Sequence, residues 1–159
     1  AEKFIKIYFD RLPRVKQYLD WVGDYARENG FIKTMFGRHI TIENINSSEN
    51  KLRSAAERQA INAPMQGSAA DIVKKAMADL IIIRAERGLT FELALQVHDE
   101  ITIYSNESEV ELSKQALKDA MEGAVSLRVP INVDVEMGYN LISKTININE
   151  NSKTNEYVA

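Results

Sequence analysis

The sequence predicts an α+β fold, in which helices pack against an antiparallel sheet. Apolar residues recur at helical spacing in three stretches, and two pairs of β-prone runs each flank a short turn. Helices and strands also come in separate blocks, whereas they would alternate in a parallel α/β protein. The predicted order along the chain is helix, hairpin, long kinked helix, hairpin, helix and strand.

The first half of the chain begins with a helix and a hairpin. Pro13 opens the helix, where its missing N–H is not needed, and Gly30 after Asn29 ends it. Two β-prone runs around a glycine, residues 31–36 and 39–42, predict the hairpin. Residues 43–50 are polar and predict a loop. The helix has an apolar stripe made of Val15, Tyr18, Leu19, Val22, Tyr25 and Ala26.

A long helical region follows, from about residue 51 to residue 87. Pro64 lies inside it, and a proline there removes a backbone hydrogen bond and clashes with the preceding turn, so we expect a kink or break. Gly88 ends the region. Two more β-prone runs, residues 91–97 and 101–104, predict a second hairpin.

The last third predicts a helix, a strand and a tail. Ser108 and Glu111 have the spacing of a capping box, which predicts a helix with Val110, Leu117, Met121 and Val125 on its apolar face. Residues 131–137 alternate between apolar and polar side chains, as in a half-buried strand. Residues 147–159 are polar and rich in Asn, so we expect a loose tail.

Composition limits the function classes. The chain has 159 residues, of which 45% are apolar and 27% charged, in the range of soluble globular domains. Cysteine is absent, which excludes disulfides and thiolate metal sites. No apolar run approaches the roughly 18 residues that a membrane helix needs. The net charge of −3 means that any nucleic-acid contact must come from a local patch. The first residue is not Met and no signal peptide follows, so we expect a piece of a longer protein.

Acidic residues form the tip of the second predicted hairpin, at His98, Asp99 and Glu100. Consecutive carboxylates at a strand turn can bind Mg²⁺, which usually takes one or two carboxylates together with phosphates and water. Two such ions about 3.5–4 Å apart can stabilise the attacking and leaving oxygens of phosphoryl transfer. The alternative is ordinary turn chemistry, since Asp favours turns. A lone histidine at a strand end is more often structural than catalytic.

A row of hydrogen-bond donors lies in the long helical region. Arg58, Asn62 and Gln66 are spaced four residues apart and therefore lie near one helix face. Because the DNA minor groove presents acceptors in similar places for different base pairs, such a row could test the shape of a pair without reading its sequence. The alternative is a solvated helix face. Small residues nearby permit close approach by a neighbouring element or by a DNA backbone.

These segments together resemble the bacterial DNA polymerase I-like family, the family A DNA polymerases. Residues 56–72 resemble the conserved helical segment of the family, and residues 96–100 resemble motif C of its palm domain. The resemblance runs in order from about Phe4 to Asn140. It also includes Tyr8-Phe9 with Pro13 and Val15, Gly37-Arg38, Asn46-Ser47-Ser48 and Val129-Pro130-Ile131.

The resemblance implies a fold, an activity and a set of residue roles. Residues 1–140 would be the C-terminal segment of a polymerase domain of right-hand type, with part of the fingers and a palm-type sheet, and residues 141–159 a C-terminal tail. Asp99 would be a catalytic ligand of two Mg²⁺ ions, Glu100 an acidic neighbour, and His98 a residue near the primer terminus. The donor row would contact primer–template DNA.

The implied partners are primer–template DNA, deoxynucleoside triphosphates and the remainder of the polymerase chain, with no membrane and a cytoplasmic, nucleoid-associated location. The second catalytic aspartate of the family lies in an Asp-Tyr-Ser-type motif, which Asp24-Tyr25-Ala26 does not match. The helix that grips the incoming nucleotide is also missing. We therefore expect the isolated chain to be inactive. The alternatives are a non-enzymatic DNA-binding or structural remnant of a polymerase, and a metal-dependent phosphoesterase built on Asp99 and Glu100.

Overall fold

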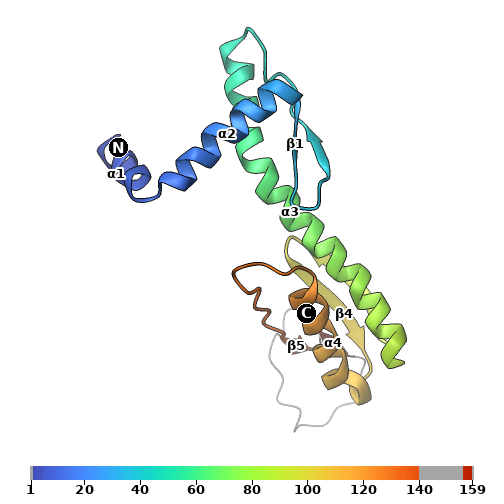
Figure 1. Ribbon diagram of the computed structural model, residues 1–159. Coiled ribbons are helices and arrows are strands. Elements are labelled where there is room, and N and C mark those ends of the chain that lie inside the picture. Colours follow the sequence, from blue (N-terminus) through green and yellow to red (C-terminus); the bar gives the residue numbers. More distant parts are fainter. Residues whose placement is uncertain (1, 140–155, 159) are drawn as a thin grey trace. The chain divides into compact units, whose positions relative to one another are not determined.

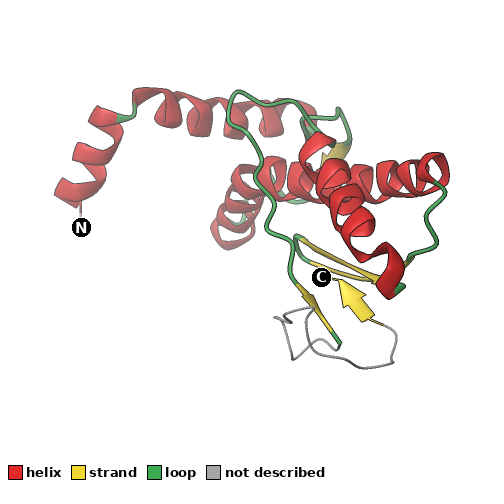
Figure 2. Cartoon of the chain, turned by 90° about the horizontal axis from the view of Figure 1, so that it is seen from below, coloured by secondary structure: helices red, strands yellow, loops and turns green. Residues whose placement is uncertain are grey.

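The computed structural model describes residues 2–139 and 156–158 and confirms the α+β class (Figures 1 and 2). Helices make up most of these residues, and the strands form two antiparallel sheets. The chain divides into two compact units, Ala1–Ala69 and Ala70–Ala159. Its elements are α1 (Glu2–Arg11), α2 (Pro13–Asn29), β1 (Phe31–Lys33), β2 (His39–Thr41), α3 (Asn50–Arg87), β3 (Glu92–Val97), β4 (Glu100–Ser105), the 3-10 helix η1 (Glu107–Glu109), α4 (Val110–Gly123), β5 (Met137–Gly138) and β6 (Glu156–Val158).

The N-terminal unit is built from α1, α2, the β1–β2 hairpin and the first part of α3. Gly30 ends α2 in the left-handed conformation, with φ of 75°, and its N–H donates to the carbonyl of Ala26 at 2.8 Å. The strands β1 and β2 pair antiparallel, with Ile32 opposite Ile40. One core cluster joins α2, the hairpin with the loop after it, and α3. It contains Val22, Ala26, Ile32, Ile42, Ile45, Ala56 and Ala60. The predicted helix, hairpin and loop are thus confirmed, with shorter strands.

The hairpin lies against α3 at Gly67. From the sequence, the small residues of this region could be approached by a neighbouring element or by a DNA backbone, and at Gly67 the neighbour is the hairpin. A Cβ atom added to Gly67 would lie 2.6 Å from Cδ1 of Ile40 and 2.9 Å from Cγ2 of Thr34. The Arg38 guanidinium donates to the Gly67 carbonyl at 3.2 Å, and the backbone N–H of Met35 donates to Oγ of Ser68 at 2.9 Å. At this position, small size therefore serves the packing of a hairpin on a helix.

The helix α3 continues through Pro64, so the predicted break does not occur, and a kink at this residue stays a prediction. Proline removes the hydrogen bond to the Ala60 carbonyl, but both residues are buried and belong to the face of the helix that packs in the N-terminal unit. Oγ of Ser68 donates to the Pro64 carbonyl at 2.5 Å, a local bond of a serine to the preceding turn. Packing of this face offsets the loss of one helical bond.

The C-terminal unit packs the end of α3 and all of α4 against the β3–β4 hairpin. Leu80, Ile101, Ile103 and Leu117 are almost fully buried in its core cluster. Gly88 ends α3 with φ of 64°, as predicted. The sheet has the strand order β3-β4-β6-β5, and all three strand pairs are antiparallel.

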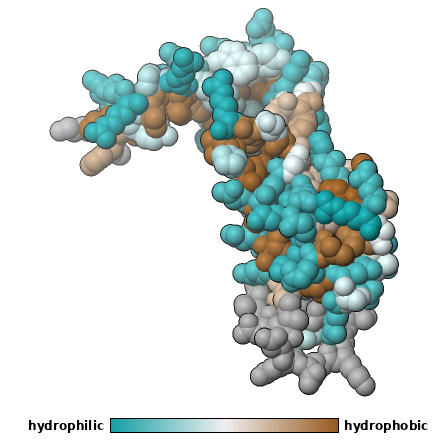
Figure 3. All heavy atoms as spheres, turned by 60° about the horizontal axis from the view of Figure 1, so that its bottom comes forward, coloured by the Kyte–Doolittle hydropathy of each residue, from teal (hydrophilic) through white to brown (hydrophobic). Residues whose placement is uncertain are grey.

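Four further features of the structure differ from the predictions. First, no helix was predicted before Pro13, yet α1 is there. Its apolar residues Phe4, Ile5 and Tyr8 have helical spacing, which is the signal that could have revealed it, and each is more than half exposed. Figure 3 shows such apolar side chains at the surface of the molecule.

Second, the prediction that Ser108 and Glu111 form a capping box is wrong. Ser108 lies inside η1, and no side chain caps α4. The carboxylate of Glu109, the residue before α4, instead accepts hydrogen bonds from the N–H and hydroxyl of Thr90 at 2.8 and 2.9 Å. The helix start is therefore tied to the loop before β3.

Third, Met137 alone of the predicted strand 131–137 is paired among the described strands, as the first residue of β5. Residues 131–137 do alternate between half-buried and exposed, as predicted. Fourth, the tail prediction is wrong for residues 156–158, which form β6. The rest of that prediction, residues 147–155 and 159, lies outside the described residues, as do Asn140 and 141–146. Among residues 2–139 and 156–158, no helix is both long and apolar enough to span a membrane.

Candidate active site and nucleic-acid surface

The acidic residues lie at the turn of the β3–β4 hairpin, as predicted. Val97 and Glu100 are the last paired residues, so His98 and Asp99 form a two-residue turn. His98 has φ of 55°, an uncommon conformation for a residue other than glycine. The side-chain amide of Gln96 donates to the His98 carbonyl at 2.7 Å and supports this turn. The hairpin thus holds Asp99 and Glu100 at one end of a regular pair of strands.

A cavity of about 480 Å³ opens at this end of the hairpin. Its lining combines apolar side chains from β4, α4 and the segment before β5 with four carboxylates. Asp99 itself is exposed, so its carboxylate is accessible from solvent and from the cavity. The lining residues are Asp99, Glu100, Ile101, Leu117, Met121, Ile131, Asn132, Val133, Asp134 and Glu136.

The carboxylates at the turn fit part of a magnesium site. Mg²⁺ is usually held by one or two carboxylates, with water and substrate phosphates as its other ligands. Asp99 and Glu100 are adjacent, are exposed and line the same cavity. Within residues 2–139 and 156–158, no group of three or more His, Asp and Glu side chains is arranged to hold a metal. The described part of the chain therefore offers Asp99 and Glu100 as the carboxylates for such an ion.

The donor row Arg58, Asn62 and Gln66 lies on the exposed side of α3. All three residues are exposed, whereas Ala60 and Pro64, on the side that packs in the N-terminal unit, are buried. Residues two positions apart on a helix differ by about 200° in direction, so the row points away from the core. The structure thus brings these three predicted residues together on one surface of the N-terminal unit, and His98, Asp99 and Glu100 together in the C-terminal unit.

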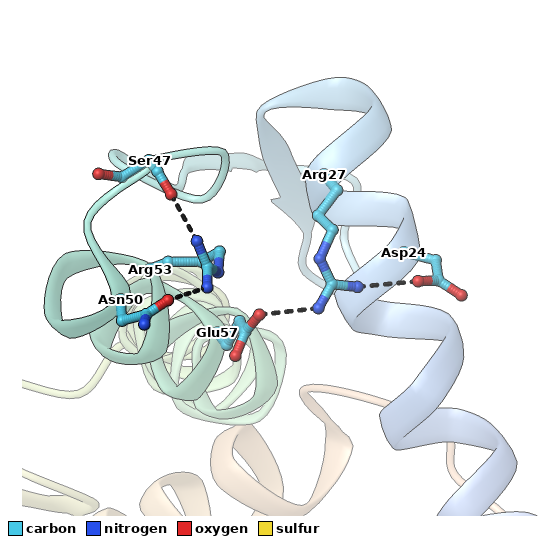
Figure 4. Close-up of polar contacts among 6 residues, drawn as sticks. All are labelled: Asp24, Arg27, Ser47, Asn50, Arg53 and Glu57. Carbon is cyan, nitrogen blue, oxygen red and sulfur yellow. Dashed lines mark hydrogen bonds and ion pairs between the residues drawn. The ribbon is translucent and has the colours of Figure 1, made fainter.

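A polar network that the sequence did not reveal holds the start of α3 against α2 (Figure 4). The guanidinium of Arg27 donates to the carboxylates of Asp24 and Glu57, at 2.8 Å in each case. The hydrogen bond with Glu57 is the main cause that raises the pKa of Arg27. Arg53 donates to the Ser47 carbonyl at 2.9 Å and to the side chain of Asn50.

The network orients the helix that carries the donor row. Asn46 also donates from its side-chain amide to the Arg27 carbonyl at 2.8 Å. The middle of the loop before α3, at Asn46 and Ser47, is therefore tied to both α2 and α3. The sequence did not predict the ion pair between Arg27 and Glu57, because these residues are thirty positions apart and share no motif.

Comparisons with known proteins identify the family. The sequence profile of DNA polymerase family A matches residues 1–143. The chain is 46% identical over 140 residues to the DNA polymerase I of Caldicellulosiruptor bescii, covering 88% of this chain and 16% of that polymerase. It is 42% identical over 140 residues to the DNA polymerase I of Pseudomonas aeruginosa, covering 88% of this chain and 15% of that one.

A solved structure is similar as well. The POL domain of Pol1 from M. smegmatis, in complex with DNA primer-template and dNTP, has a TM-score of 0.77 and 41% identity, over 82% of this chain and 23% of that one. The chain thus spans about a sixth of the length of the curated relatives, by the 16% coverage above. The match to the family profile covers most of the chain, including both the donor row and the acidic turn. This chain belongs to DNA polymerase family A.

Proposed function

We propose that this chain forms part of the active site of a template-directed DNA polymerase. In the reaction, the primer 3′-hydroxyl attacks the α-phosphate of a deoxynucleoside triphosphate, the new phosphodiester bond forms, and pyrophosphate leaves. The observation that carries the proposal is the pair Asp99 and Glu100 at a hairpin turn beside a cavity, in a chain of family A. The solved relative in complex with primer-template and dNTP supports the same substrates.

Asp99 is the residue we assign to metal binding, and Glu100 is its acidic neighbour. Two bound Mg²⁺ ions would supply charge stabilisation for the attacking and leaving oxygens. The hairpin keeps the Asp99 carboxylate in place, since a two-residue turn between paired strands is held better than a long loop. His98 holds the turn and lies near the primer terminus. A second aspartate, from a segment outside this chain, completes the ligand set.

Arg58, Asn62 and Gln66 are the residues we assign to primer–template DNA. Each is exposed on the same side of α3 and can donate hydrogen bonds. Donors in a row along the minor groove would meet acceptors of every correctly paired base pair. This suits an enzyme that must accept any template sequence. Arg58 also adds a positive charge that attracts phosphate.

The remainder of the polymerase is the third partner in this proposal. Residues 1–140 belong to its fingers and palm, and residues 141–159 are a C-terminal extension that includes β6. The residues that grip the triphosphate lie outside this chain, and so does the second aspartate. The isolated chain therefore does not extend a primer. The complete protein is associated with the nucleoid, because its substrate is DNA.

Primer extension by the complete polymerase tests the role of the acidic turn. Asp99→Asn should lower kcat by about 10³-fold or more, the scale on which loss of one group that stabilises transition-state charge acts. Glu100→Gln should have a smaller effect. Glu92→Gln is the matched control, because Glu92 is an exposed carboxylate at the other end of β3. Full activity of the Asp99 variant, or extension by the isolated chain, would contradict the proposal.

Duplex binding by the isolated chain separates the donor row from a solvated helix face. Arg58→Ala should weaken binding and reduce the slope of log K against log salt by about one. Arg58→Lys keeps the charge and tests the contribution of the guanidinium. Gln66→Ala is compared with Gln17→Ala, since Gln17 is an exposed glutamine on a different helix, α2. Equal affinities in all four variants would rule out the row as a DNA contact.

A further inference from the structure

A continuous row of aromatic side chains runs from α2 to the β1–β2 hairpin in the N-terminal unit. Each ring lies against the next, with ring centres 6.0, 5.3, 6.0 and 4.1 Å apart in order along the row. The last two rings, of Phe31 and His39, are stacked with only 16° between their planes. We call these residues the ring row: Tyr18, Trp21, Tyr25, Phe31 and His39.

The helix α2 holds its three rings on one side, next to the buried side. Tyr18, Trp21 and Tyr25 are three and four positions apart, so they are neighbours on the helix surface. Val22 and Ala26 are buried in the core of the unit. Trp21 is 55% exposed, although tryptophan has one of the largest apolar surfaces of any side chain. The core of the unit therefore leaves much of this ring free to pack against a ligand.

The hairpin presents its two rings on the face that points away from α3. Lys33 is paired with His39 and lies two positions from Phe31, so these three side chains share one face. The other face carries Ile32 and Ile40, which pack in the core of the unit and against α3. The donor row points away from the same core on the far side of α3. The ring row is therefore a surface separate from the donor row.

Cationic side chains lie at both ends of the ring row. Arg14 is exposed and precedes Tyr18 by four positions, so it lies on the same side of α2. At the other end, the ammonium group of Lys33 lies 5.8 Å from the centre of the Phe31 ring. A ligand that extends along the rings would therefore meet a positive charge at each end.

The acidic residues of α2 leave the row open to an anion. Asp20 and Asp24 are each in an ion pair within α2, with N···O distances of 2.7 and 2.8 Å. Glu28 is exposed and lies three positions after Tyr25, at the edge of the row. Its charge opposes an anionic ligand at one point, which makes it useful in a test.

Unpaired bases fit both the rings and the cations. The flat face of any base can stack on Tyr, Trp, Phe or His, and the backbone phosphates pair with Arg and Lys. A duplex offers only base edges in its grooves, because its base faces are stacked on one another. We propose that the ring row binds single-stranded DNA by base stacking; DNA is the strand we assign because the chain belongs to a DNA polymerase family. The proposal goes beyond the proposed function, since it requires neither the acidic turn nor the donor row.

The fluorescence of Trp21 tests stacking directly, because Trp21 is the single tryptophan of the chain. A dT oligonucleotide of about 12 nucleotides, within the site sizes of single-strand binders, should quench it. An abasic strand of the same length keeps the phosphates but has no bases. That strand, and a blunt duplex of the same length, should each need about tenfold higher concentrations to quench Trp21 to the same extent. Equal quenching by the abasic strand would overturn stacking, and equal quenching by the duplex would overturn the preference for a single strand.

Substitutions at Trp21 test the same contact through affinity, measured by the fluorescence anisotropy of a labelled dT oligonucleotide. Trp21→Ala should weaken binding about tenfold, the scale of one base stacked on an aromatic ring. Trp21→Phe keeps a ring and should stay within about threefold of the parent. Tyr8→Ala is the matched control, because Tyr8 is an aromatic residue of α1 outside the ring row and is 51% exposed. Equal affinities of Trp21→Ala and Tyr8→Ala would overturn the proposal.

Two charge variants and one sedimentation measurement complete the test. Arg14→Gln should reduce the slope of log K against log salt by about 0.7, the value for one phosphate contact on a single strand. Glu28→Gln should strengthen binding, because it removes a negative charge at the edge of the row. An unchanged slope together with weaker binding by Glu28→Gln would contradict an anionic ligand. Self-association of the parent that Trp21→Ala abolishes, with unchanged DNA affinity, would make the row an interface between copies and overturn the proposal.

Discussion

The two compact units of this chain carry opposite net charges. Residues 1–69 contain eleven Lys and Arg and eight Asp and Glu, a net charge of +3, whereas residues 70–159 contain nine and fifteen, a net charge of −6. The basic unit carries the exposed donor row on α3, and the acidic unit carries the turn with Asp99. The overall charge of −3 therefore conceals one surface suited to phosphates and one suited to cations.

The cores of the two units also differ. In the N-terminal unit, the hairpin approaches α3 at Gly67, so close backbone contact shapes this unit. The C-terminal cluster includes Phe91, Leu80 and Leu117, and larger side chains fill its interior. Truncation should therefore harm the C-terminal unit most, and added volume should harm the N-terminal unit most.

The largest expected effect is that of Phe91→Ala in the C-terminal unit. Phe91 is 1% exposed, and the Arg84 guanidinium lies 5.9 Å from its ring centre. Its truncation should lower the free energy of unfolding by about 3–5 kcal/mol. Amide exchange in β4 reports on this unit, and the fluorescence of Trp21 in α2 reports on the other.

Comparing these two signals sharpens the contrast between the units. The two core clusters share no residue. Phe91→Ala should therefore lower the free energy of unfolding reported by Trp21 less than the free energy of opening measured by amide exchange in β4. Equal changes at both places would show that the two units unfold together. The difference in their cores would then have no separate thermodynamic meaning.

Local patterns predicted the elements that depend on neighbours in the sequence. Apolar periodicity predicted α2 and most of α3, and the β-prone runs around His98 and Asp99 predicted the hairpin that carries the acidic turn. The exposed row on α3 also follows from spacing alone, since a regular helix fixes the direction of each residue. Both candidate surfaces could therefore be located before the structure was known.

Long-range contacts account for what the sequence did not reveal. Continuation of α3 through Pro64 depends on packing of the hairpin, and the start of α4 depends on Thr90, nineteen positions before its partner Glu109. Strand β6 pairs with β4, more than fifty positions earlier in the chain. No local pattern encodes such partners, because a polar tail with a short β-prone run looks the same with or without them.

Gly67→Ala adds volume to the N-terminal unit and should have an intermediate effect. The added Cβ would lie too close to Ile40 and Thr34, and such overpacking costs about 1–3 kcal/mol. The gain in helix propensity offsets about 0.5–1 kcal/mol of this, so we expect a net loss of about 1 kcal/mol in urea unfolding. Exchange at the Met35 amide, which is bonded to Ser68, should speed up.

Gly23→Ala is the matched control in α2 of the same unit. An added Cβ there would lie 3.5 Å from the guanidinium of Arg27, which is an ordinary contact with the end of a long side chain. This variant should be more stable by about 0.5–1 kcal/mol, from helix propensity alone. If Gly67→Ala were also stabilising, close approach of the hairpin would not be what constrains residue 67.

The smallest expected effect concerns the ion pair between Arg87 and Asp119 in the acidic unit. The Arg87 guanidinium donates to the Asp119 carboxylate, which also accepts from Gln115 at 2.7 Å. The hydrogen bond from Arg87, followed by that from Gln115, lowers the pKa of Asp119. The side chains of Arg87 and Asp119 are 41% and 35% exposed, so solvent weakens the ion pair to about 0.2–1 kcal/mol.

The sign of the pKa shift sets the pH dependence of this contribution. A lowered pKa means that the folded protein favours the ionised carboxylate, so the stabilisation is present above the unfolded pKa of about 3.9 and is lost as the pH falls through the folded value. Asp119→Asn should therefore be less stable than the parent at pH 7, and the difference should vanish in acid. Glu111→Gln is the control, because its carboxylate is more exposed than that of Asp119 and its ion pair with Lys114 is longer, at 3.4 Å. If the Asp119 difference persisted below pH 3, the lost contact would be a hydrogen bond that does not need the charge, and the acidity of this unit would play no part in its stability.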